Sequence, residues 1–322
     1  MKAIQITQTG GPEVLTLADL PVPAPKSHEV MVKVHATGVN FIDIYYREGR
    51  YKTELPFIDG QEAAGVVEAV GEGVEDFAVG DVVAWCNVLG TYTEYALAPA
   101  ERLVKLPAHL EPKLAAAVML QGMTAHYLAH STFPLKRGDT ALVHAAAGGV
   151  GLLLTQMASQ LGARVIATVS TEEKAALARE AGAAVVILYT HVDFETETRR
   201  LTDGRGVDVV YDSVGKTTFE KSLNVLRPRG LMALFGASSG AVSPFDLIEL
   251  AAKGSLFVTR PTLKHYALKR DELVERATAV FDAVAAGTLK VRMEHSYLLA
   301  EARQAHIDLA GRKTTGKVLL IP

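Results

Sequence analysis

The stretch HAAAGGVGLLLTQMASQLGA, residues 144–163, decides the fold of this 322-residue chain. It follows the apolar run TALVHAA and opens a segment with helical composition. In the dinucleotide-binding pattern G-x-G-x-x-G, a strand passes through a glycine turn into a helix whose N-terminus binds a pyrophosphate. Here the three positions are Ala146, Gly148 and Gly151. We therefore expect a nucleotide-binding turn that tolerates one methyl group; an ordinary strand–helix turn is the alternative.

Apolar runs alternate with helix-length segments on both sides of this turn. They read TALVHAA, RVIATV, AVVILY, VDVVYDSV, GLMALFG and SLFVTR. Such runs are typical of a parallel sheet that helices cover on both faces, and six of them match a complete doubly wound nucleotide-binding fold. The fold class is therefore α/β.

The two ends of the chain have a different character. EVMVKVHATG, residues 29–38, alternates apolar and polar residues as a strand does, and glycines separate the Val-rich segments after it, which predicts a compact β-rich domain. EPKLAAAVMLQGMTAHYLAH, residues 111–130, has helical composition. The tail from residue 265 predicts a helix ending at Gly287, a short helix near residues 300–310, and a last strand in GKVLLIP.

Composition narrows the class of protein. The length suggests roughly two domains. The formal net charge is −3, so the sequence has no basic footprint of a nucleic-acid-binding protein. Cys86 is the one cysteine, which allows no intrachain disulfide and favours a reducing cytoplasm. The N-terminus does not resemble a signal peptide, and no apolar run is long enough to span a membrane.

The end of the second apolar run predicts which dinucleotide is bound. An NAD site places a carboxylate there for the ribose 2′-hydroxyl, but RVIATVS ends in Ser170 and is followed by Thr171 and Lys174. A hydroxyl and an ammonium suit a 2′-phosphate, which favours NADPH. Ser170 could instead be an N-cap paired with Glu173, and Lys174 a surface lysine. Tyr189, after the third run, could reach the same phosphate or only cover the strand edge.

Several motifs together resemble a known family. GVNFIDIYYREGRY, HAAAGGVG, VVYDSVG, FGASSGAV, GSLFVTRP and the ending LLIP are similar to the zinc-free quinone oxidoreductase (ζ-crystallin) branch of the medium-chain dehydrogenase/reductase superfamily. The resemblance covers essentially the whole chain. It implies a GroES-like catalytic domain from residues 1–123 and 265–322, and a Rossmann domain from residues 124–264.

The zinc dehydrogenases of this superfamily hold their metal with cysteine and histidine. The matching stretches here read GVNFID, DGQEAAG and MLQGMT, so Asn40, Gln61 and Gln121 occupy or adjoin the ligand positions, and Glu62 alone remains of the acidic pair. Neutral amides cannot replace thiolate and imidazole. We expect a metal-free site, and a zinc dehydrogenase is the less favoured alternative.

The resemblance also implies roles for individual residues. We read GVNFIDIYYREGRY, residues 38–51, as a strand that packs through Phe41, Ile42 and Ile44. The implied catalytic and substrate-contacting residues are Asn40, Asp43, Tyr45, Tyr51 and Gln121. The implied cofactor-binding residues are Asn40, Gln121, Thr124, Gly148, Gly149, Val150, Ser170, Lys174, Tyr189, Ser213, Phe235, Gly236, Ser238, Thr259 and Arg312. Lys174, Tyr189 and Arg312 are expected on the 2′-phosphate.

These expectations combine into one functional hypothesis. The chain is expected to reduce quinones with NADPH, in a cleft between its domains, with amide and phenol donors near the substrate oxygen. One alternative is an enone, alkenal or enoyl-thioester reductase, in which Tyr51 would donate a proton. Another is a nucleotide-regulated RNA-binding or structural protein. GSLFVTRP is expected to pair across a homodimer, and His144 to be structural rather than an acid catalyst.

Overall fold

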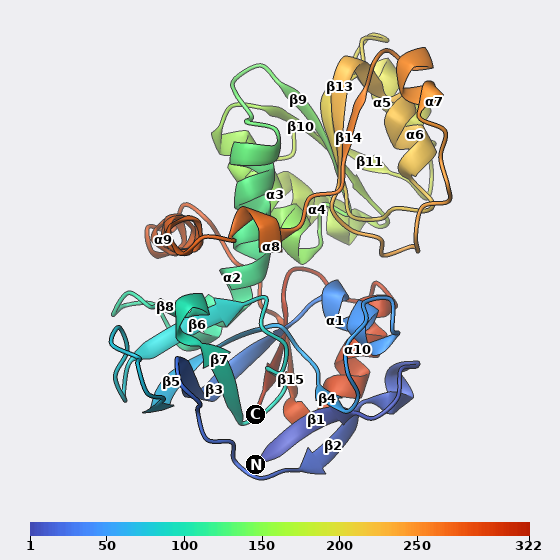
Figure 1. The fold of residues 1–322 in the computed structure, drawn as a ribbon. Coiled ribbons are helices and arrows are strands. Elements are labelled where there is room, and N and C mark those ends of the chain that lie inside the picture. Colours follow the sequence, from blue (N-terminus) through green and yellow to red (C-terminus); the bar gives the residue numbers. More distant parts are fainter. The chain divides into compact units, whose positions relative to one another are not determined.

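The computed structural model describes residues 1–322, which form two compact units. Unit 1 consists of Met1–Met123 and Tyr266–Pro322, and unit 2 of Thr124–His265 (Figure 1). The chain therefore leaves the first unit, builds the second and returns.

Unit 2 contains a six-stranded parallel sheet in the order β11-β10-β9-β12-β13-β14. The strands are β9 (Thr140–His144), β10 (Arg164–Val169), β11 (Val185–Leu188), β12 (Val207–Asp212), β13 (Leu226–Leu234) and β14 (Phe257–Thr259). All six predicted strands are confirmed. The order is that of the doubly wound dinucleotide fold, which reverses direction between β9 and β12.

Helices cover both faces of this sheet. They are α3 (Gly149–Gln160), α4 (Glu172–Glu180), α5 (Phe194–Leu201), α6 (Phe219–Asn224) and α7 (Ile248–Ala252), followed by the short α8 (Leu263–Tyr266). The helix pairs α3–α4 and α5–α6 pack together on opposite sides (Figure 1). Because both faces are covered, Leu142, Ile166 and Val210 on neighbouring strands are all fully buried. This burial explains the uninterrupted apolar runs in the sequence.

Unit 1 is built on a seven-stranded sheet and a smaller three-stranded one. The large sheet has the order β15-β16-β3-β5-β6-β8, with β7 also paired to β3, and the small one β2-β1-β4. The strands are β1 (Lys2–Ile6), β2 (Thr16–Asp19), β3 (Glu29–Val39), β4 (Phe57–Ile58), β5 (Glu62–Val70), β6 (Val82–Cys86), β7 (Tyr95–Pro99), β8 (Val104–Lys105), β15 (His295–Leu298) and β16 (Val318–Ile321).

The helical elements of unit 1 lie around these sheets. They are η1 (Pro12–Val14), α1 (Phe41–Arg47), η2 (Ala100–Arg102), α2 (Pro112–Tyr127), α9 (Arg270–Ala285), η4 (Leu299–Glu301) and α10 (Ala302–Ala310); α2 runs on into unit 2, where the π-helical turn η3 (Leu128–Thr132) follows it. The predicted helices are confirmed, and Gly287 follows α9 with a φ of 70°. No helix is long and apolar enough to cross a membrane.

The strand pattern of β3 follows its sequence closely. Val30, Val32 and Val34 are buried, whereas Lys33 and His35 are exposed. The two-residue period thus marks the face that packs on the core cluster of unit 1.

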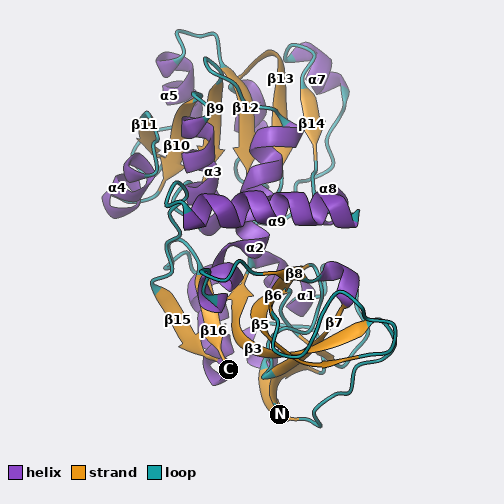
Figure 2. Ribbon diagram, turned by 90° about the vertical axis from the view of Figure 1, so that its left-hand side faces the viewer, coloured by secondary structure: helices purple, strands orange, loops and turns teal.

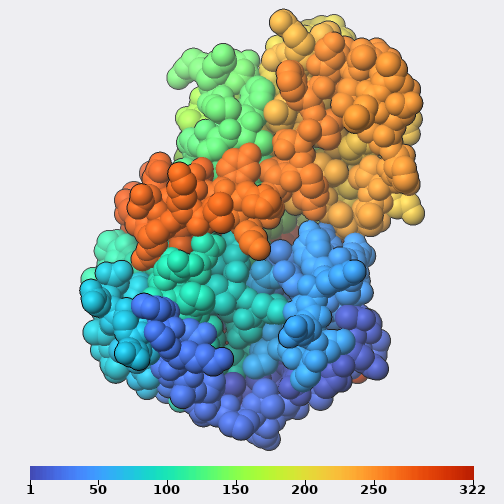
Figure 3. Space-filling model, in the orientation of Figure 1, coloured from blue at the N-terminus to red at the C-terminus, as the bar shows by residue number.

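The C-terminal tail of the chain completes unit 1. The last strand, β16, pairs antiparallel with β3, and Val318 lies opposite Val39 (Figure 2). In the same unit, α9 packs over η2, and Arg270 on α9 donates to the carbonyl oxygen of Glu101 at 3.0 Å. Figure 3 shows the C-terminal part of the chain, in orange, lying directly against teal residues from the first half of the chain. The register of β16 places Lys317 beside Asn40, although 277 positions separate them in sequence.

One predicted element is wrong. Residues 41–47 form the helix α1, not a strand. The Asn40 main-chain N–H donates to Asp43 Oδ2 at 2.7 Å, so the side chain three residues into the segment caps the start of the helix. The aromatic and β-branched residues suggested a strand by propensity, but the Asn-x-x-Asp cap prevails over that weak preference.

Candidate functional site

The glycine turn of unit 2 has the geometry that close packing requires. A Cβ atom on Gly151 would lie 2.3 Å from the carbonyl oxygen of Ala145, so this residue must be glycine for α3 to pack on the turn. Gly148 is the N-cap of α3, and a Cβ there would meet only the Ala145 oxygen, at 3.2 Å. The left-handed conformation falls on Ala145, with a φ of 50°, and not on Ala146. The N-terminus of α3, formed by Gly149 and Val150, is left open for an anion.

The tips of β10 and β11 carry the residues predicted to recognise a 2′-phosphate. Ser170 follows β10, and the Thr190 hydroxyl donates to its carbonyl oxygen at 2.9 Å. Tyr189 follows β11 and is 40% exposed, and Lys174 lies in the first turn of α4. These side chains therefore come from one edge of the sheet.

The cap of α4 differs from the one read from sequence. The N-cap is Thr171, not Ser170, and the Thr171 hydroxyl accepts from the Lys174 main-chain N–H at 3.3 Å. Because β10 extends as far as Val169, the helix begins one residue later than the alternative reading of this segment assumed. Capping therefore does not use the Ser170 hydroxyl.

The residues predicted for the nicotinamide half follow the carboxyl ends of β12, β13 and β14. Phe235 N–H donates to the Asp212 carbonyl at 2.9 Å, and Ser238 N–H donates to the Ser213 carbonyl at 3.1 Å. A Cβ on Gly236 would lie 2.5 Å from the Ser213 oxygen. Thr259 is the last residue of β14. The structure thus gathers these residues beyond the sheet edge where doubly wound folds bind their ligands.

Thr124 and Arg312 lie on other elements. Thr124 is in α2 and is 7% exposed. Arg312 lies in unit 1, just after α10, with a φ of 58°. Their predicted roles toward a cofactor stay predictions.

In unit 1, Asn40 lies at the centre of a buried polar cluster. Its Nδ2 donates to Glu62 Oε2 at 2.8 Å and to the Gly38 carbonyl at 3.3 Å. Its Oδ1 accepts from Gln121 Nε2 and from Lys317 Nζ, each at 3.1 Å. Both donors and both acceptor positions of the amide are therefore occupied by protein groups.

A buried ion pair anchors this cluster. Lys317 is 1% exposed and donates to Glu62, which is fully buried. The other Glu62 oxygen accepts from the Leu120 main-chain N–H at 2.5 Å. No group of three or more His, Cys, Asp or Glu side chains is placed to hold a metal. Glu62 therefore compensates the buried ammonium charge of Lys317.

Asp43 lies in an adjoining buried network. Its Oδ2 accepts from the Tyr92 hydroxyl at 2.9 Å, and Tyr92 contacts His306 Nε2 at 3.1 Å. Since Arg47 can only donate, and lies 3.2 Å from His306 Nδ1, that nitrogen accepts and Nε2 carries the proton. Burial, with a smaller contribution from Arg47, lowers the pKa of His306 to about 3. The imidazole is therefore neutral, and the chain of donors points toward Asp43.

The carboxyl groups of Asp43 and Asp59 each have one oxygen without a hydrogen-bond partner. Both side chains are fully buried. Burial raises the pKa of Asp43 to about 7, and burial together with the Asp43 charge raises the pKa of Asp59 well above its usual value. Because burial disfavours the ionised form of both groups, and the Asp43 charge further raises the pKa of Asp59, these carboxyl groups keep a proton to a higher pH than exposed aspartates do.

Tyr45 and Tyr51 form an aromatic group at the end of α1. The Tyr51 ring stands edge-on to Tyr45, with centroids 5.7 Å apart, and to Tyr46, at 5.4 Å. Tyr45 is 7% exposed and lies under the Arg50 guanidinium, whereas Tyr51 is 39% exposed. Of the two predicted tyrosines, Tyr51 is the more accessible to a ligand.

His144 is held inside unit 2. Its Nδ1 lies 2.8 Å from Thr168 Oγ1, and its Nε2 lies 3.0 Å from Ser222 Oγ, which also donates to Asp212. Burial lowers the pKa of His144. Both ring nitrogens are satisfied, as expected of a structural histidine.

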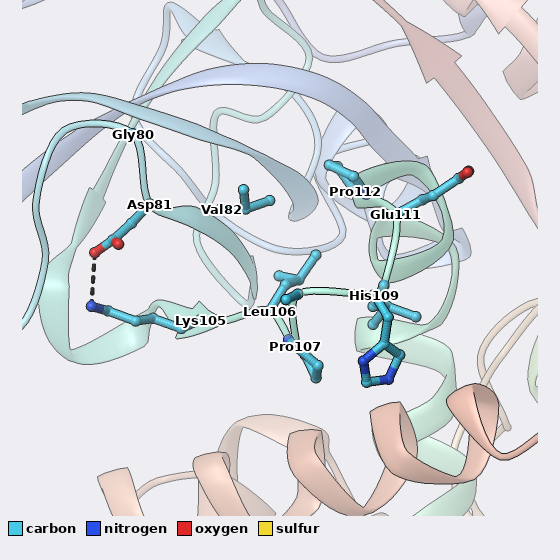
Figure 4. A pocket seen from close by; sticks show the side chains of 11 residues that line it. Gly80, Asp81, Val82, Lys105, Leu106, Pro107, His109, Glu111 and Pro112 are labelled. Carbon is cyan, nitrogen blue, oxygen red and sulfur yellow. Dashed lines mark ion pairs between the residues drawn. The ribbon is translucent and has the colours of Figure 1, made fainter.

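A separate cavity of about 390 Å³ lies in unit 1, lined by residues 80–82 and 105–112 (Figure 4). Lys105 and Asp81 form an ion pair at one side, with a 2.8 Å contact. None of the predicted site residues lines it.

Sequence reasoning missed Lys317, Tyr92 and His306. Lys317 had one signal, a lone lysine before the apolar run VLLIP. Tyr92 and His306 lie in segments without a recognisable pattern. Only the pairing of β16 with β3 and the packing of α10 bring them to the site.

A β-rich domain with a returning tail and a doubly wound domain define the medium-chain dehydrogenase/reductase class. The family model described as "Alcohol dehydrogenase GroES-like domain" matches residues 26–108, and the one described as "Zinc-binding dehydrogenase" matches residues 149–279. A quinone oxidoreductase of Pseudomonas aeruginosa is 47% identical over 100% of this chain and 99% of its own length.

Two further relatives are similar over their full lengths. A 2-haloacrylate reductase of Burkholderia is 46% identical over 99% of this chain and 98% of its own. The structure of Escherichia coli quinone oxidoreductase complexed with NADPH superposes with a TM-score of 0.98, at 43% identity and 100% coverage of both chains. This chain belongs to the quinone oxidoreductase branch of the medium-chain dehydrogenase/reductase superfamily.

Proposed function

We propose that this protein reduces quinones with NADPH without a catalytic metal. The observation that carries the proposal is the Asn40 cluster. At the place of the zinc ligands, the chain has two amides and a Glu62–Lys317 ion pair, which do not form a metal site. Full-length similarity to quinone oxidoreductases supports the same conclusion.

The residues of unit 2 fit a phosphorylated dinucleotide. Gly148 and Gly151 leave the N-terminus of α3 open to a pyrophosphate, and Ser170 and Lys174 offer a hydroxyl and an ammonium at the tip of β10. We assign the 2′-phosphate to Lys174, Tyr189 and Arg312. When bound, NADPH supplies the reducing equivalents.

The polar residues of unit 1 that were predicted for catalysis receive two kinds of role in this proposal. Asn40 and Asp43 are committed to protein partners, so we assign them positioning roles. Tyr51, Tyr45 and the second N–H of Gln121 are the donors we assign to the substrate oxygen, where negative charge develops on reduction. A quinone needs little further acid catalysis, because its reduced anion is already delocalised.

A panel of acceptors tests this function. Quinones, enals, enoyl thioesters and 2-haloacrylate would each be mixed with NADPH and enzyme, and both the NADPH oxidation rate and the semiquinone signal would be recorded. We expect quinones to be reduced fastest. If none of the quinones supported NADPH oxidation, the proposal would be contradicted.

The 2-haloacrylate reductase relative favours a second candidate, the reduction of an activated carbon–carbon double bond. This reaction needs a proton at the α-carbon, and the accessible Tyr51 is the candidate donor. Tyr51→Phe separates the two functions. It should slow reduction of a double bond about 100-fold or more, whereas quinone reduction should lose tenfold or less.

We further propose a homodimer and, from the lone cysteine, a cytoplasmic location. β14 is the edge strand of its sheet, and Phe257 on it is 60% exposed. An exposed apolar edge strand is a natural pairing surface for a second copy.

A further inference from the structure

The orientation of the Asn40 amide is forced by its charged neighbours. The Lys317 ammonium can only donate hydrogen bonds, and the ionised Glu62 carboxylate can only accept them. Asn40 therefore turns Oδ1 toward Lys317 and Nδ2 toward Glu62, at 3.1 and 2.8 Å. The reverse orientation would set donor against donor and acceptor against acceptor.

The same constraint passes on to Gln121. Its side chain contacts Asn40 Oδ1 at 3.1 Å, and an acceptor must be met by a donor. Gln121 therefore presents Nε2 to Asn40, which fixes where its carbonyl oxygen lies. That oxygen, Oε1, is buried and has no hydrogen-bond partner in the protein, and the residue as a whole is 9% exposed, so water does not replace the missing partner. A buried unpaired acceptor requires an explanation, since leaving it unpaired costs free energy.

We propose that Lys317 is a positioning residue that orients the Asn40 and Gln121 amides so that Gln121 Oε1 accepts a hydrogen bond from the bound ligand. The ligand group must carry an N–H or O–H. The carboxamide N–H of the nicotinamide ring and the hydroxyl of a hydroquinone both qualify. The inference rests on the proposed function. It adds a hydrogen-bond acceptor, Gln121 Oε1, to the hydrogen-bond donors that the proposed function assigns to the same site.

Paired ligands distinguish the two sources. The 3-acetylpyridine analogue of NADP⁺ lacks the carboxamide N–H, and the thionicotinamide analogue keeps it. If the cofactor is the donor, wild-type protein should bind the thionicotinamide analogue about 3- to 10-fold more tightly than the 3-acetylpyridine analogue. This is the gain in affinity expected from one neutral hydrogen bond. If the substrate is the donor, the protein should bind hydroquinone more tightly than its dimethyl ether, by a similar factor. Dissociation constants from calorimetry give both ratios.

Gln121→Met should reduce the larger of these ratios to about 1. The matched control is Thr198→Val in α5, which removes another buried unpartnered oxygen and should leave both ratios unchanged. Wild-type oxidation of NADPH by quinones, measured in parallel, tests the proposed function separately. If quinone reduction is normal and neither ratio depends on Gln121, the acceptor role is overturned.

The positioning role of Lys317 needs its own variants. Replacing both charges with Lys317→Met and Glu62→Gln removes the constraint on Asn40, so the ratio should collapse, whereas Lys317→Arg should preserve it. A folded double variant that retains the wild-type ratio would overturn this role.

Gln121→Glu tests whether the Asn40 amide is held in one orientation, and this test does not depend on whether the Lys317 variants fold. Only a protonated carboxyl at this position can donate to Asn40 Oδ1 and also accept from the ligand. The ligand ratio of this variant should therefore change with pH, because ionisation removes the donor to Asn40 Oδ1 and turns the acceptor for the ligand into a charged one. A ratio independent of pH would count against a locked Asn40.

Discussion

At the residue scale, the hydrogen-bond partners of the buried polar side chains in unit 1 determine which of these side chains can bind a ligand or retain a proton. Asn40 is saturated, Gln121 has one free acceptor, and Asp43 and Asp59 each have an unpaired oxygen. Buried polar groups are costly unless paired, so we connect the unpaired Gln121 oxygen with a bound ligand and the unpaired carboxyl oxygens of Asp43 and Asp59 with retained protons.

The raised pKa of Asp43 predicts how stability depends on pH. Its folded pKa, about 7, exceeds the ordinary aspartate pKa of 3.8, so the folded state binds the proton more tightly than the unfolded state. This stabilisation is complete below about pH 4 and is lost as the pH rises through 7. The free energy of unfolding in urea should therefore fall between pH 5 and pH 8.

Asp43→Asn should flatten that profile by about 1.4 kcal/mol for each unit of pKa shift it removes. Asp81 serves as a contrast, because its contact with Lys105 lowers its pKa. Asp81→Asn should leave the fall above pH 5 in place. A wild-type profile that rises from pH 5 to 8 would disprove the raised pKa of Asp43.

The proposed contact between Lys174 and the 2′-phosphate predicts that the protein prefers NADPH to NADH. If its ammonium contacts the 2′-phosphate, Lys174→Ala should weaken NADPH about 10- to 100-fold, since hydrogen bonds between charged groups are strong, and should leave NADH almost unchanged. Arg179→Ala, on the same helix and 55% exposed, is the matched control. Equal losses of both cofactors in the Lys174 variant, measured by fluorescence titration, would refute the assignment.

At the scale of elements, helix starts decide where the site residues lie. The caps at Asn40 and Thr171 begin α1 and α4, and the glycine turn begins α3. Each cap fixes the side chains of the following turn, which explains why the site residues cluster at helix N-termini.

Two glycine substitutions should separate folding from binding at α3. Gly151→Ala places a methyl group 2.3 Å from a main-chain oxygen, so we expect a loss of about 1–3 kcal/mol in stability. Gly148→Ala meets only one atom, at 3.2 Å, so its stability should change little while NADPH binding weakens. Thermal unfolding and titration of each variant measure the two effects. Equal stability of both variants would contradict the packing argument.

At the scale of the whole molecule, the chain crosses between its units twice, and the returning tail supplies part of unit 1. β16 and α10 bring Lys317 and His306 to residues near position 40. The polar clusters therefore form only when both ends of the chain have folded together.

The β14 edge predicts the oligomeric state. Phe257→Lys places a charge on the exposed edge, which should split a homodimer into monomers of 34.4 kDa without unfolding unit 2. The control is Val79→Lys, since Val79 is 65% exposed in unit 1 and should not affect assembly. Sedimentation of the wild type as a monomer at micromolar concentration would exclude the proposed interface.

The sequence by itself determined the doubly wound sheet, the glycine turn, the returning strand and the family. Those features are local: apolar periodicity and a turn pattern depend on neighbouring residues. It misjudged α1 and the cap of α4, because one capping side chain can outweigh the propensities of several residues. Only the tertiary structure decided the Lys317–Glu62 pair, the saturation of Asn40 and the raised pKa values of Asp43 and Asp59. These depend on strand register and on desolvation, which arise when distant segments pack together and exclude water.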